Sequence, residues 1–557
     1  MSDPSRATAV PGAVPPIQAA GTQQHPSTFA PATFVLLVIL CLFGAVIGVQ
    51  LILQLGITPN TSIIGALVAM LLARVPGAIF ARYRSIHVQN LAQSAISAAT
   101  FGAANSLLLP IGVPFLLGRP DLILPMLVGA ALSMLLDGYL LYRMFDTRVF
   151  PASGTWPPGV AAAEAIRAGD AGGRRAAMLG IGLLIGIAGS WIRLPAAWFG
   201  LTASAGVGIP MSAFGVAFIG NVWALTMFGI GLLIRGYAMP VAGIDIAKLY
   251  VPHGAMVGAG LVALIQVALL IARRGTGDAL AAATDDRRMR RALGLGSMGY
   301  MAIAVLIALM GGLIAEMSPG MLVAFVVYAA FAAFVHELIV GISAMHAGWF
   351  PAFAVALITL IIGILLGFPP VALALLVGFS ASTGPAFADM GYDLRAGYLL
   401  RGEGANPAFE LAGRKQQLYA AMLAFLIAIP TVYFAYPGYF SQDLVPPVDR
   451  VYVATIKAGA TAEVAQALLI WAIPAAVIQL LGGPSRQLGI LLATGLLIPN
   501  PMAGWAVLAG IAIRIAVLRF KGKEATGSME VLAAGFIGGD ALFGFFDSVI
   551  KTVPKAK

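Results

Sequence analysis

Long apolar runs separated by short polar stretches dominate the pattern of this chain. Two of the clearest, 33–54 and 293–315, are each about 20 residues long and show no strict alternation of apolar and polar positions. A helix of that length crosses the roughly 30 Å of bilayer hydrocarbon, whereas barrel strands are shorter and alternate in hydrophobicity. The pattern therefore predicts an all-α, polytopic membrane protein.

The apolar runs predict about sixteen transmembrane helices in two halves of about eight, a plan common in transporters. A ninth crossing in the second half would place the C-terminal lysines outside, so one candidate there is expected not to cross. The short pair around Pro499-Asn500-Pro501 and the run 371–387 are the suspects. The candidates are 33–54, 61–80, 90–117, 122–142, 176–192, 196–218, 220–235 and 252–272, and then 293–315, 319–345, 351–367, 371–387, 417–438, 463–481, 485–499, 502–519 and 529–550.

Composition divides the chain into four expected parts. Residues 1–32 are rich in Pro, Ala, Thr and Gln and are expected to be a disordered cytoplasmic tail. Residues 33–272 form the first transmembrane half and 293–557 the second. The arginine-rich stretch 273–292 is expected to be a charged cytoplasmic linker between them.

Charge supports a membrane protein over other classes. Only 10% of the residues are charged and 60% are hydrophobic, whereas a soluble domain carries about 25% charged residues. The net charge of +10 comes from basic residues in short loops, so nucleic-acid binding is not expected. The single cysteine, Cys41, lies in the first apolar run, which excludes a disulfide framework.

Basic residues are unevenly divided between the two sides of the first eight spans. Thirteen arginines lie in the linker and in the loops on the side of the N-terminus, against four basic residues in the alternate loops. Because cytoplasmic loops carry an excess of Lys and Arg, we expect a plasma (inner) membrane protein with a cytoplasmic N-terminus. The first group is Arg82, Arg84, Arg143, Arg148, Arg167, Arg174, Arg175, Arg273, Arg274, Arg287, Arg288, Arg290 and Arg291, and the second is Arg119, Arg193, Arg235 and Lys248.

Sequence signatures of nucleotide-driven or hydrolytic chemistry are missing. The chain has no Walker A loop and no G-x-S-x-G elbow, and the HELIV segment that begins at His336 lacks the second histidine of a zinc protease. No catalytic site, resident metal or cofactor is therefore expected. These absences favour secondary transport, driven by an ion gradient, over an enzyme.

Ionisable residues within the apolar runs are candidates for energy coupling. A charge at mid-membrane costs about 2.5–3.5 kcal/mol on insertion scales, so such residues usually have a function. Glu337 lies deepest by count and is the first candidate for carrying a coupled proton. Asp540, in the last run, is the second, while Asp137 lies near the end of its run and is expected at the membrane interface.

Uncharged polar groups and histidines supply candidates for substrate binding. Asn90 and Gln93 are three residues apart, so both amides lie on one face of a helix. An amide donates and accepts hydrogen bonds, which suits a peptide or chelate backbone, although it equally suits helix–helix packing. Gln89, Asn105, His253 and His336 complete the set; His253 precedes an apolar run at a Pro-Gly break.

One stretch of the chain carries a family signature. Residues 387–400 read FADMGYDLRAGYLL, and RKQQ follows at 414–417. Together they resemble the DLKTGYLLG…PRRQQ signature of the oligopeptide transporter (OPT) superfamily. Stretches 88–99, 151–170 and 533–542 resemble other parts of that family in the same order, so the resemblance covers 33–550 and indicates a bacterial-type member.

The chain also departs from the family pattern. It carries an insert at 402–413, has Arg395-Ala396 in place of Lys-Thr, and closes with Gly539-Asp540 in place of Gly-Glu. The resemblance implies proton-coupled symport of small peptides or peptide-like metal chelates, with that substrate and membrane lipid as the partners. A passive channel and a polytopic membrane transferase are the alternatives. A transferase needs clustered catalytic groups in one loop, but 143–175 and 388–416 resemble ordinary connecting loops.

Cysteines introduced one at a time at Ala281 and Arg119, in a Cys41→Ser background, test the predicted sidedness. An impermeant thiol reagent applied to intact cells should label position 119 and spare position 281, because the charge bias places the linker in the cytoplasm. Labelling at 281 but not at 119 would overturn the orientation.

Overall fold

The computed structural model describes residues 24–552 apart from 56–65, 67–68, 71–76, 78–79, 196–206, 273–278, 349, 351 and 460. The described residues are almost entirely helical and include ten helices long and apolar enough to cross a membrane. This confirms the predicted all-α, multi-pass class. Two two-residue strands, β1 (Arg193–Leu194) and β2 (Val207–Gly208), pair antiparallel in a connection.

The helices follow one another with short connections. In the first part of the chain they are α1 (Pro31–Leu55), η1 (Phe80–Arg84), α3 (Ile86–Phe101), the π-helix η2 (Gly102–Leu108), α4 (Leu109–Leu116), η3 (Pro120–Leu122), α5 (Ile123–Met144), α6 (Pro157–Ala171), α7 (Gly173–Trp191), α8 (Met211–Ile219), α9 (Val222–Ala242) and α10 (Val251–Ala272). The remainder are α11 (Ala279–Met310), α12 (Leu313–Glu316), α13 (Pro319–Ala347), α14 (Ala352–Leu365), α15 (Pro370–Ser382), α16 (Pro385–Leu400), α17 (Pro407–Phe440), α18 (Pro447–Ala458), α19 (Ala462–Arg486), α20 (Leu488–Leu497), α21 (Pro501–Lys521), η5 (Lys523–Ala525) and α22 (Thr526–Thr552).

The two regions suspected of not crossing are both irregular. Helix α20 has 10 residues and is about 15 Å long, half of a membrane crossing. Asn500 then caps α21, accepting a bond from Ala503 N at 3.1 Å, and Pro501 occupies the first helical position. The run 371–387 is broken at Gly384, between α15 and α16. The expected span 61–80 lies mostly outside the described residues.

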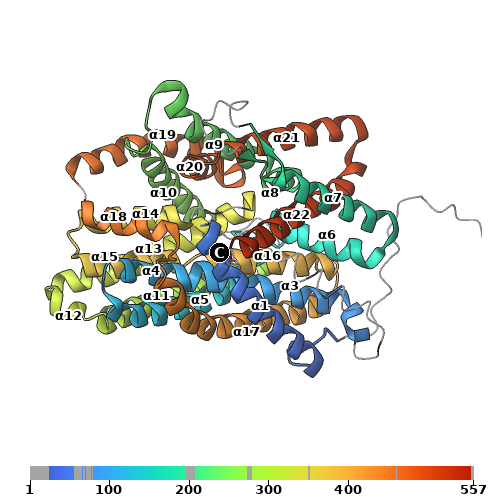
Figure 1. The fold of residues 1–557 in the computed structure, drawn as a ribbon, viewed down its shortest axis with the longest axis horizontal. Coiled ribbons are helices and arrows are strands. Elements are labelled where there is room, and N and C mark those ends of the chain that lie inside the picture. The colour runs from blue at the N-terminus through green and yellow to red at the C-terminus, as the bar shows by residue number, and fades with distance from the viewer. Residues whose placement is uncertain are drawn as a thin grey trace, which may run out of the picture.

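The helices form two bundles, each of which contains helices from both halves of the sequence. One bundle pairs α7, α8, α9 and α10 with α22, α21, α20 and α19, in inverse order along the chain. The other holds α1, α3, α5, α11 and α13–α17. Figure 1 shows α9, α19, α20 and α21 along one side, with α1, α5, α11 and α17 along the opposite side.

Exposure separates peripheral helices from central ones. In α19, 17% of the most apolar stretch is buried, whereas in the α15–α16 segment the corresponding stretch is 100% buried. An apolar helix that is largely uncovered suits a lipid-facing position. The α15–α16 segment is therefore interior, enclosed by protein.

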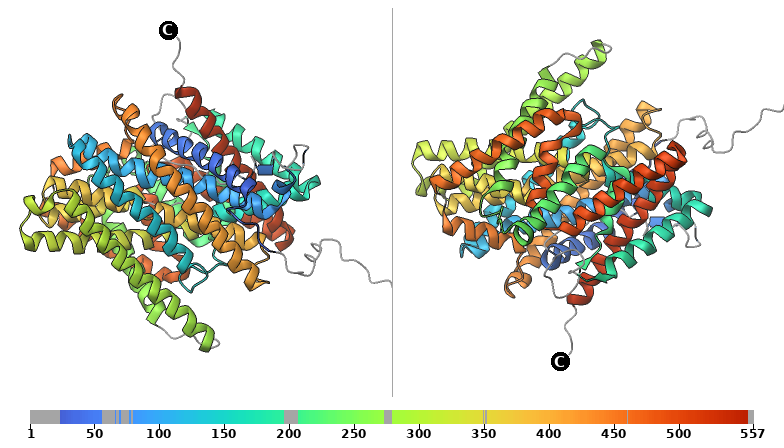
Figure 2. Two further views of the ribbon diagram at one scale, coloured as in Figure 1. Left: turned by 90° about the horizontal axis from the view of Figure 1, so that it is seen from below. Right: turned by 90° about the horizontal axis from the view of Figure 1, so that it is seen from above.

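Two parts of the chain expected to lack structure are helical or docked. Residues 279–292 of the expected linker are the first turns of α11, which extend away from the other helices (Figure 2). In the expected tail, Thr28 is fully buried; its N–H and hydroxyl bond to the side chain and carbonyl of Gln416, each at 2.8 Å. Residues 1–23 lie outside the described part of the chain.

The prediction that 143–175 and 388–416 are ordinary loops is wrong. Residues 157–171 form α6, most of which is buried. Residues 388–400 belong to α16, which is buried along nearly its whole length, and α17 begins at Pro407. The polar residues of these segments suggested loops, but several of them, including Glu164, Asp389 and Asp393, are buried inside the protein.

Gly-xxx-Gly pairs bring helix backbones close together at four places along the chain. A Cβ at Gly258 of α10 would overlap the carbonyl oxygen of Ala472 in α19, and one at Gly186 of α7 would lie 2.7 Å from the Phe536 oxygen in α22. The pairs that face another helix's backbone are Gly44/Gly48, Gly182/Gly186, Gly254/Gly258 and Gly535/Gly539. The pair Gly363/Gly367 is different, because Gly367 has φ +80° in a turn and faces open space.

Gly258→Ala should lower the free energy of unfolding by about 1–3 kcal/mol, because the new methyl group forces α10 and α19 apart. Gly294→Ala in α11 is the matched control: a Cβ there meets nothing within 4 Å. Thermal unfolding of the purified protein in detergent should show a lower midpoint for the first variant only. Equal midpoints would contradict the close packing.

Candidate functional site

A line of polar side chains runs along the buried helix α16. Gly384 precedes its first turn and Arg401 follows its last, with Asp389 and Asp393 between them. The 18 residues from Gly384 to Arg401 correspond to about 27 Å of helix, which is most of the roughly 30 Å hydrocarbon thickness. We define these residues and their bonding partners as the α16 polar line.

Small residues allow other helices to approach α16 closely. A Cβ at Gly391 would overlap the Trp156 ring, and one at Gly397 would overlap the Gln417 side chain. From the other side, a Cβ at Gly159 of α6 would overlap the carbonyl oxygen of Tyr392. Helix α16 is therefore enclosed by neighbours that exclude lipid from its polar groups.

The middle of the α16 polar line faces α3. Gln93 Nε2 donates to Asp393 Oδ1, and Ser97 Oγ donates to Asp389 Oδ1, both at 2.5 Å. Asn90 Nδ2 in turn donates to Gln93 Oε1 at 2.9 Å. The prediction that Asn90 and Gln93 share one face is confirmed, and that face is directed at the carboxylates of α16.

The start of α16 receives a third carboxylate, Asp137 of α5. The N–H of Gly384 donates to Asp137 Oδ2 at 2.6 Å, and the Tyr300 hydroxyl of α11 donates to Oδ1 at 2.5 Å. Gly384 has φ +96°, a conformation that a side chain rarely tolerates. Asp137 therefore accepts a hydrogen bond from the backbone at the break between α15 and α16.

Glu337 of α13 lies beside this group. Its side chain is fully buried, as its depth in the sequence predicted. Neither carboxyl oxygen has a hydrogen bond of regular geometry to a described residue, and the Tyr300 hydroxyl interacts electrostatically with both Glu337 and Asp137. One phenol thus lies between two buried carboxyl groups from different helices.

His336, next to Glu337 in the sequence, faces a different set of partners. Its Nδ1 lies 3.0 Å from Ser380 Oγ, and Ser380 donates to Thr359 Oγ1 at 3.2 Å. Because the Ser380 hydroxyl proton is used in that bond, the histidine Nδ1 is the donor. His336 therefore joins α13 to α15 and α14 without contacting the Asp137 group through these bonds.

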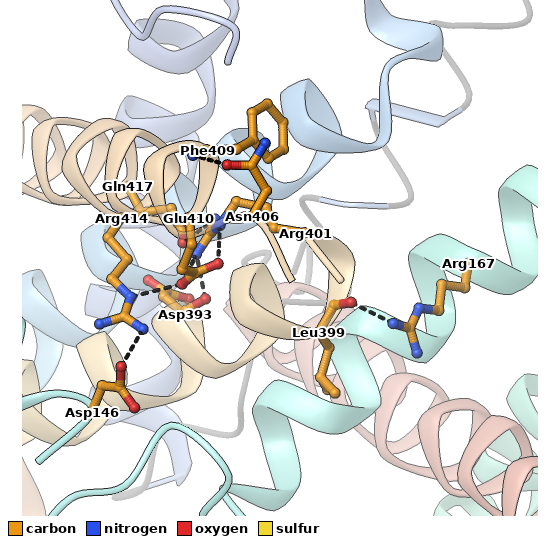
Figure 3. Close-up of polar contacts among 11 residues, drawn as sticks. Asp146, Arg167, Asp393, Leu399, Arg401, Asn406, Phe409, Glu410, Arg414 and Gln417 are labelled. Carbon is orange, nitrogen blue, oxygen red and sulfur yellow. Dashed lines mark hydrogen bonds and ion pairs between the residues drawn. The ribbon is translucent and has the colours of Figure 1, made fainter. Parts of the chain in front are cut away.

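An ionic cluster closes the other end of the α16 polar line (Figure 3). Arg401 donates to both carboxylate oxygens of Glu410, from Nε at 2.8 Å and Nη2 at 3.1 Å. Arg414 donates to the same carboxylate at 2.7 Å and also to Asp146 at 3.0 Å. The Arg401 and Glu410 side chains are 0% and 4% exposed, so the pair is shielded from water.

Gln417 connects the ionic cluster to the middle of the line. Its Oε1 accepts from Arg401 Nη1 at 2.8 Å, while its Nε2 donates to the Asp393 carbonyl at 2.6 Å and to Ser94 at 3.1 Å. In Figure 3 the labelled Arg401, Glu410, Gln417 and Asp393 lie together, whereas Arg167 reaches the Leu399 carbonyl from another helix. Side chains from α3, α6 and α17 thus converge on the end of α16.

Asp540, the second candidate for proton coupling, lies in the other bundle. Ser190 of α7 donates to Asp540 Oδ1 at 2.5 Å, and both the N–H and the hydroxyl of Ser212 in α8 donate to Oδ2. These three bonds fasten α22 to α7 and α8. The structure does not bring Asp540 together with Glu337.

The remaining candidates are dispersed. Gln89 Nε2 bonds the Tyr83 carbonyl at 2.9 Å, near the start of α3. Asn105 lies in the π-helix η2 and is partly buried. His253 lies near the start of α10, with its ring 5.6 Å from that of Tyr250.

The sequence analysis did not identify Asp137, Asp389 or Asp393 as buried carboxylates. Asp137, expected at the membrane interface, has a side chain that is fully buried inside the protein, because α5 continues past it among other helices. Asp389 and Asp393 were treated as part of a loop. Their four-residue spacing, which puts both on one helical face, was the available signal.

Comparison with known proteins identifies a family. A family model described as OPT oligopeptide transporter protein matches residues 29–551. No curated protein matches the chain. The matched region contains the whole α16 polar line, together with Asp137 of α5 and Glu337 of α13.

Glu410→Gln should destabilise the protein by about 3–5 kcal/mol, because Arg401 and Arg414 would lose the buried charge that neutralises them. Glu524→Gln, at an exposed position in η5, is the control and should leave stability unchanged. Thermal unfolding in detergent measures both. Equal unfolding midpoints for the two variants would show that the ionic cluster does not stabilise the end of α16.

Proposed function

The chain belongs to the OPT oligopeptide transporter family, and we propose that it is a secondary active transporter that couples uptake of oligopeptides or peptide-like metal chelates to proton entry. The observation that carries this proposal is the buried carboxyl of Glu337, which lies beside Asp137 and Tyr300 and forms no ion pair with a described residue. A group in that environment is suited to exchanging a proton.

The position of Glu337 suits coupling because α13 contacts both bundles. Helix α13 packs on α11 and α16 in one bundle and on α9, α10 and α20 in the other. At one such contact, a Cβ at Gly260 of α10 would lie 3.0 Å from Ile339, two residues after Glu337. A change of charge at Glu337 thus occurs on a helix that both bundles share.

In the proposed cycle, the protein's groups bind substrate and exchange one proton. When the substrate site is open to one side of the membrane, Glu337 takes up a proton as substrate binds. When the site is open to the other side, Glu337 releases the proton and substrate leaves. Movement of the bundles relative to each other would change the exposed side. Tyr300 would orient the carboxyl, and no nucleotide is consumed.

The amide groups of α3 remain candidates for substrate contact. Asn90 Oδ1 and Gln89 Oε1 are buried acceptors with no hydrogen-bond partner among the described residues. A peptide N–H group would satisfy such an acceptor. We also propose roles in substrate contact for Gln93, Asn105, His253 and His336, with Gln93 acting through its bond to Asp393.

Glu337→Gln should abolish accumulation of substrate in proteoliposomes under an imposed pH difference, while counterflow of labelled substrate continues. Glutamine resembles the protonated carboxyl in shape and charge but cannot release a proton. The assay first screens di- to pentapeptides and iron chelates for a transported substrate. Glu463→Gln, at an exposed position of α19, is the matched control and should accumulate substrate normally.

Three other outcomes would change the proposal. Accumulation by Glu337→Gln would make Glu337 structural, and loss of accumulation in Asp540→Asn alone would assign the proton to Asp540 instead. Flux in the wild-type protein that follows the substrate gradient and ignores the pH difference would identify a passive channel.

A further inference from the structure

Asp389 and Asp393 are two carboxyl groups on one face of a helix with no cation beside them. They are four residues apart, so their side chains emerge about 5–6 Å from each other. Both are fully buried. The arginines at the end of α16 are engaged with Glu410 and Asp146, and no ion pair to Asp389 or Asp393 exists among the described residues.

Each of these carboxyl groups is only half satisfied. Asp389 Oδ1 accepts from Ser97 and Asp393 Oδ1 from Gln93, but the two Oδ2 atoms have no partner in the described structure. Between them in the sequence, Tyr392 is also fully buried, its hydroxyl has no partner among the described groups, and it interacts electrostatically with Asp389. The two Oδ2 atoms and the Tyr392 hydroxyl oxygen, all from about one helical turn, therefore have no hydrogen-bond partner among the described residues.

Two ionised carboxylates at this separation and burial would repel each other strongly. A divalent cation could neutralise them, but Ca²⁺ takes six to eight oxygen ligands and Mg²⁺ six. Far fewer unpaired oxygen atoms are present at this position, and no metal-binding group of three His, Cys, Asp or Glu residues occurs in the described part of the chain. A proton requires one or two oxygens and fits the site.

We propose that Asp389 and Asp393 form a second proton-binding site, which holds at least one proton in the conformation described and exchanges it during transport. The site rests on the proposed function, because it assigns a further coupled proton to the same transporter. In the binding step one carboxylate Oδ2 forms an O–H bond with a proton from the open side of the membrane. In the release step that bond breaks and the proton leaves to the other side, with no change of redox state.

The polar groups around the pair come from several helices packed on α16. Helix α6 contributes Glu164 and Arg167, the latter bonded to the Leu399 carbonyl. Helix α3 contributes Gln93, Ser94 and Ser97, and α17 contributes Gln417, which connects to Arg401 and Glu410. Toward the other end of α16 lie Asp137 of α5, Tyr300 of α11 and Glu337 of α13. A proton at the pair and a proton at Glu337 of α13 would thus lie at two positions alongside the buried helix α16.

The test compares Asp389→Asn and Asp393→Asn with the wild-type protein in proteoliposomes. Substrate flux and proton flux, the latter from a trapped pH dye, are measured together. Each variant should transport fewer protons per substrate than wild type while retaining substrate counterflow, because asparagine preserves the shape of a neutral carboxyl. Asp443→Asn, whose side chain is 74% exposed, is the control and should keep the wild-type ratio.

A second measurement guards against variants that do not fold. The infrared band of protonated carboxyl groups in wild type should lose intensity in each Asn variant, and Asp389→Glu, which keeps a carboxyl, should recover both the band and the proton flux. An unchanged band and an unchanged proton-to-substrate ratio in both Asn variants would overturn the proposal, even where wild type is proton-coupled. If wild-type flux itself ignores the pH difference, the proposed function fails first. Replacement of proton dependence by Na⁺ dependence in wild type would identify a sodium site instead.

Discussion

A lipid bilayer offers no water to a polar group. At membrane depth every polar group must therefore find a hydrogen-bond partner within the protein or bind a ligand there. In this molecule that constraint is concentrated on α16. The helix carries two aspartates, receives a third at its broken start, and ends in an arginine, yet almost none of its surface is exposed. The arrangement of α3, α5, α6, α13 and α17 around it follows from the need to cover these groups.

Glycines make this enclosure possible. Gly391 and Gly397 leave room for Trp156 and Gln417, which could not otherwise approach the α16 backbone. The gain is polar as well as apolar, because Gln417 uses its amide to join α16, α3 and Arg401. Close packing and hydrogen bonding are thus aspects of one interface, and a larger residue at either glycine would disturb both.

The two bundles meet around α13, which carries Glu337. Its partner Tyr300 belongs to α11, and the Asp137 that Tyr300 also contacts bonds the first residue before α16. A proton at Glu337 therefore alters the electrostatics of a group that is joined to the backbone break at Gly384. By contrast, Asp540 is bonded within the second bundle and stabilises the packing of α7, α8 and α22.

The sequence alone determined the helical membrane class, the family resemblance and the burial of Glu337, because the length of an apolar run, the order of motifs and the depth of a residue within a run are all properties of the linear chain. It did not determine that 388–400 is an interior helix or that Asp137 is buried. Polar residues in a short segment indicate a loop when each is considered by itself. Only the tertiary structure brings Gln93, Ser97 and Tyr300 against Asp393, Asp389 and Asp137, from positions hundreds of residues distant in two of the three pairs. Whether a carboxylate can be buried depends on such partners, and their approach is a property of the packed helices.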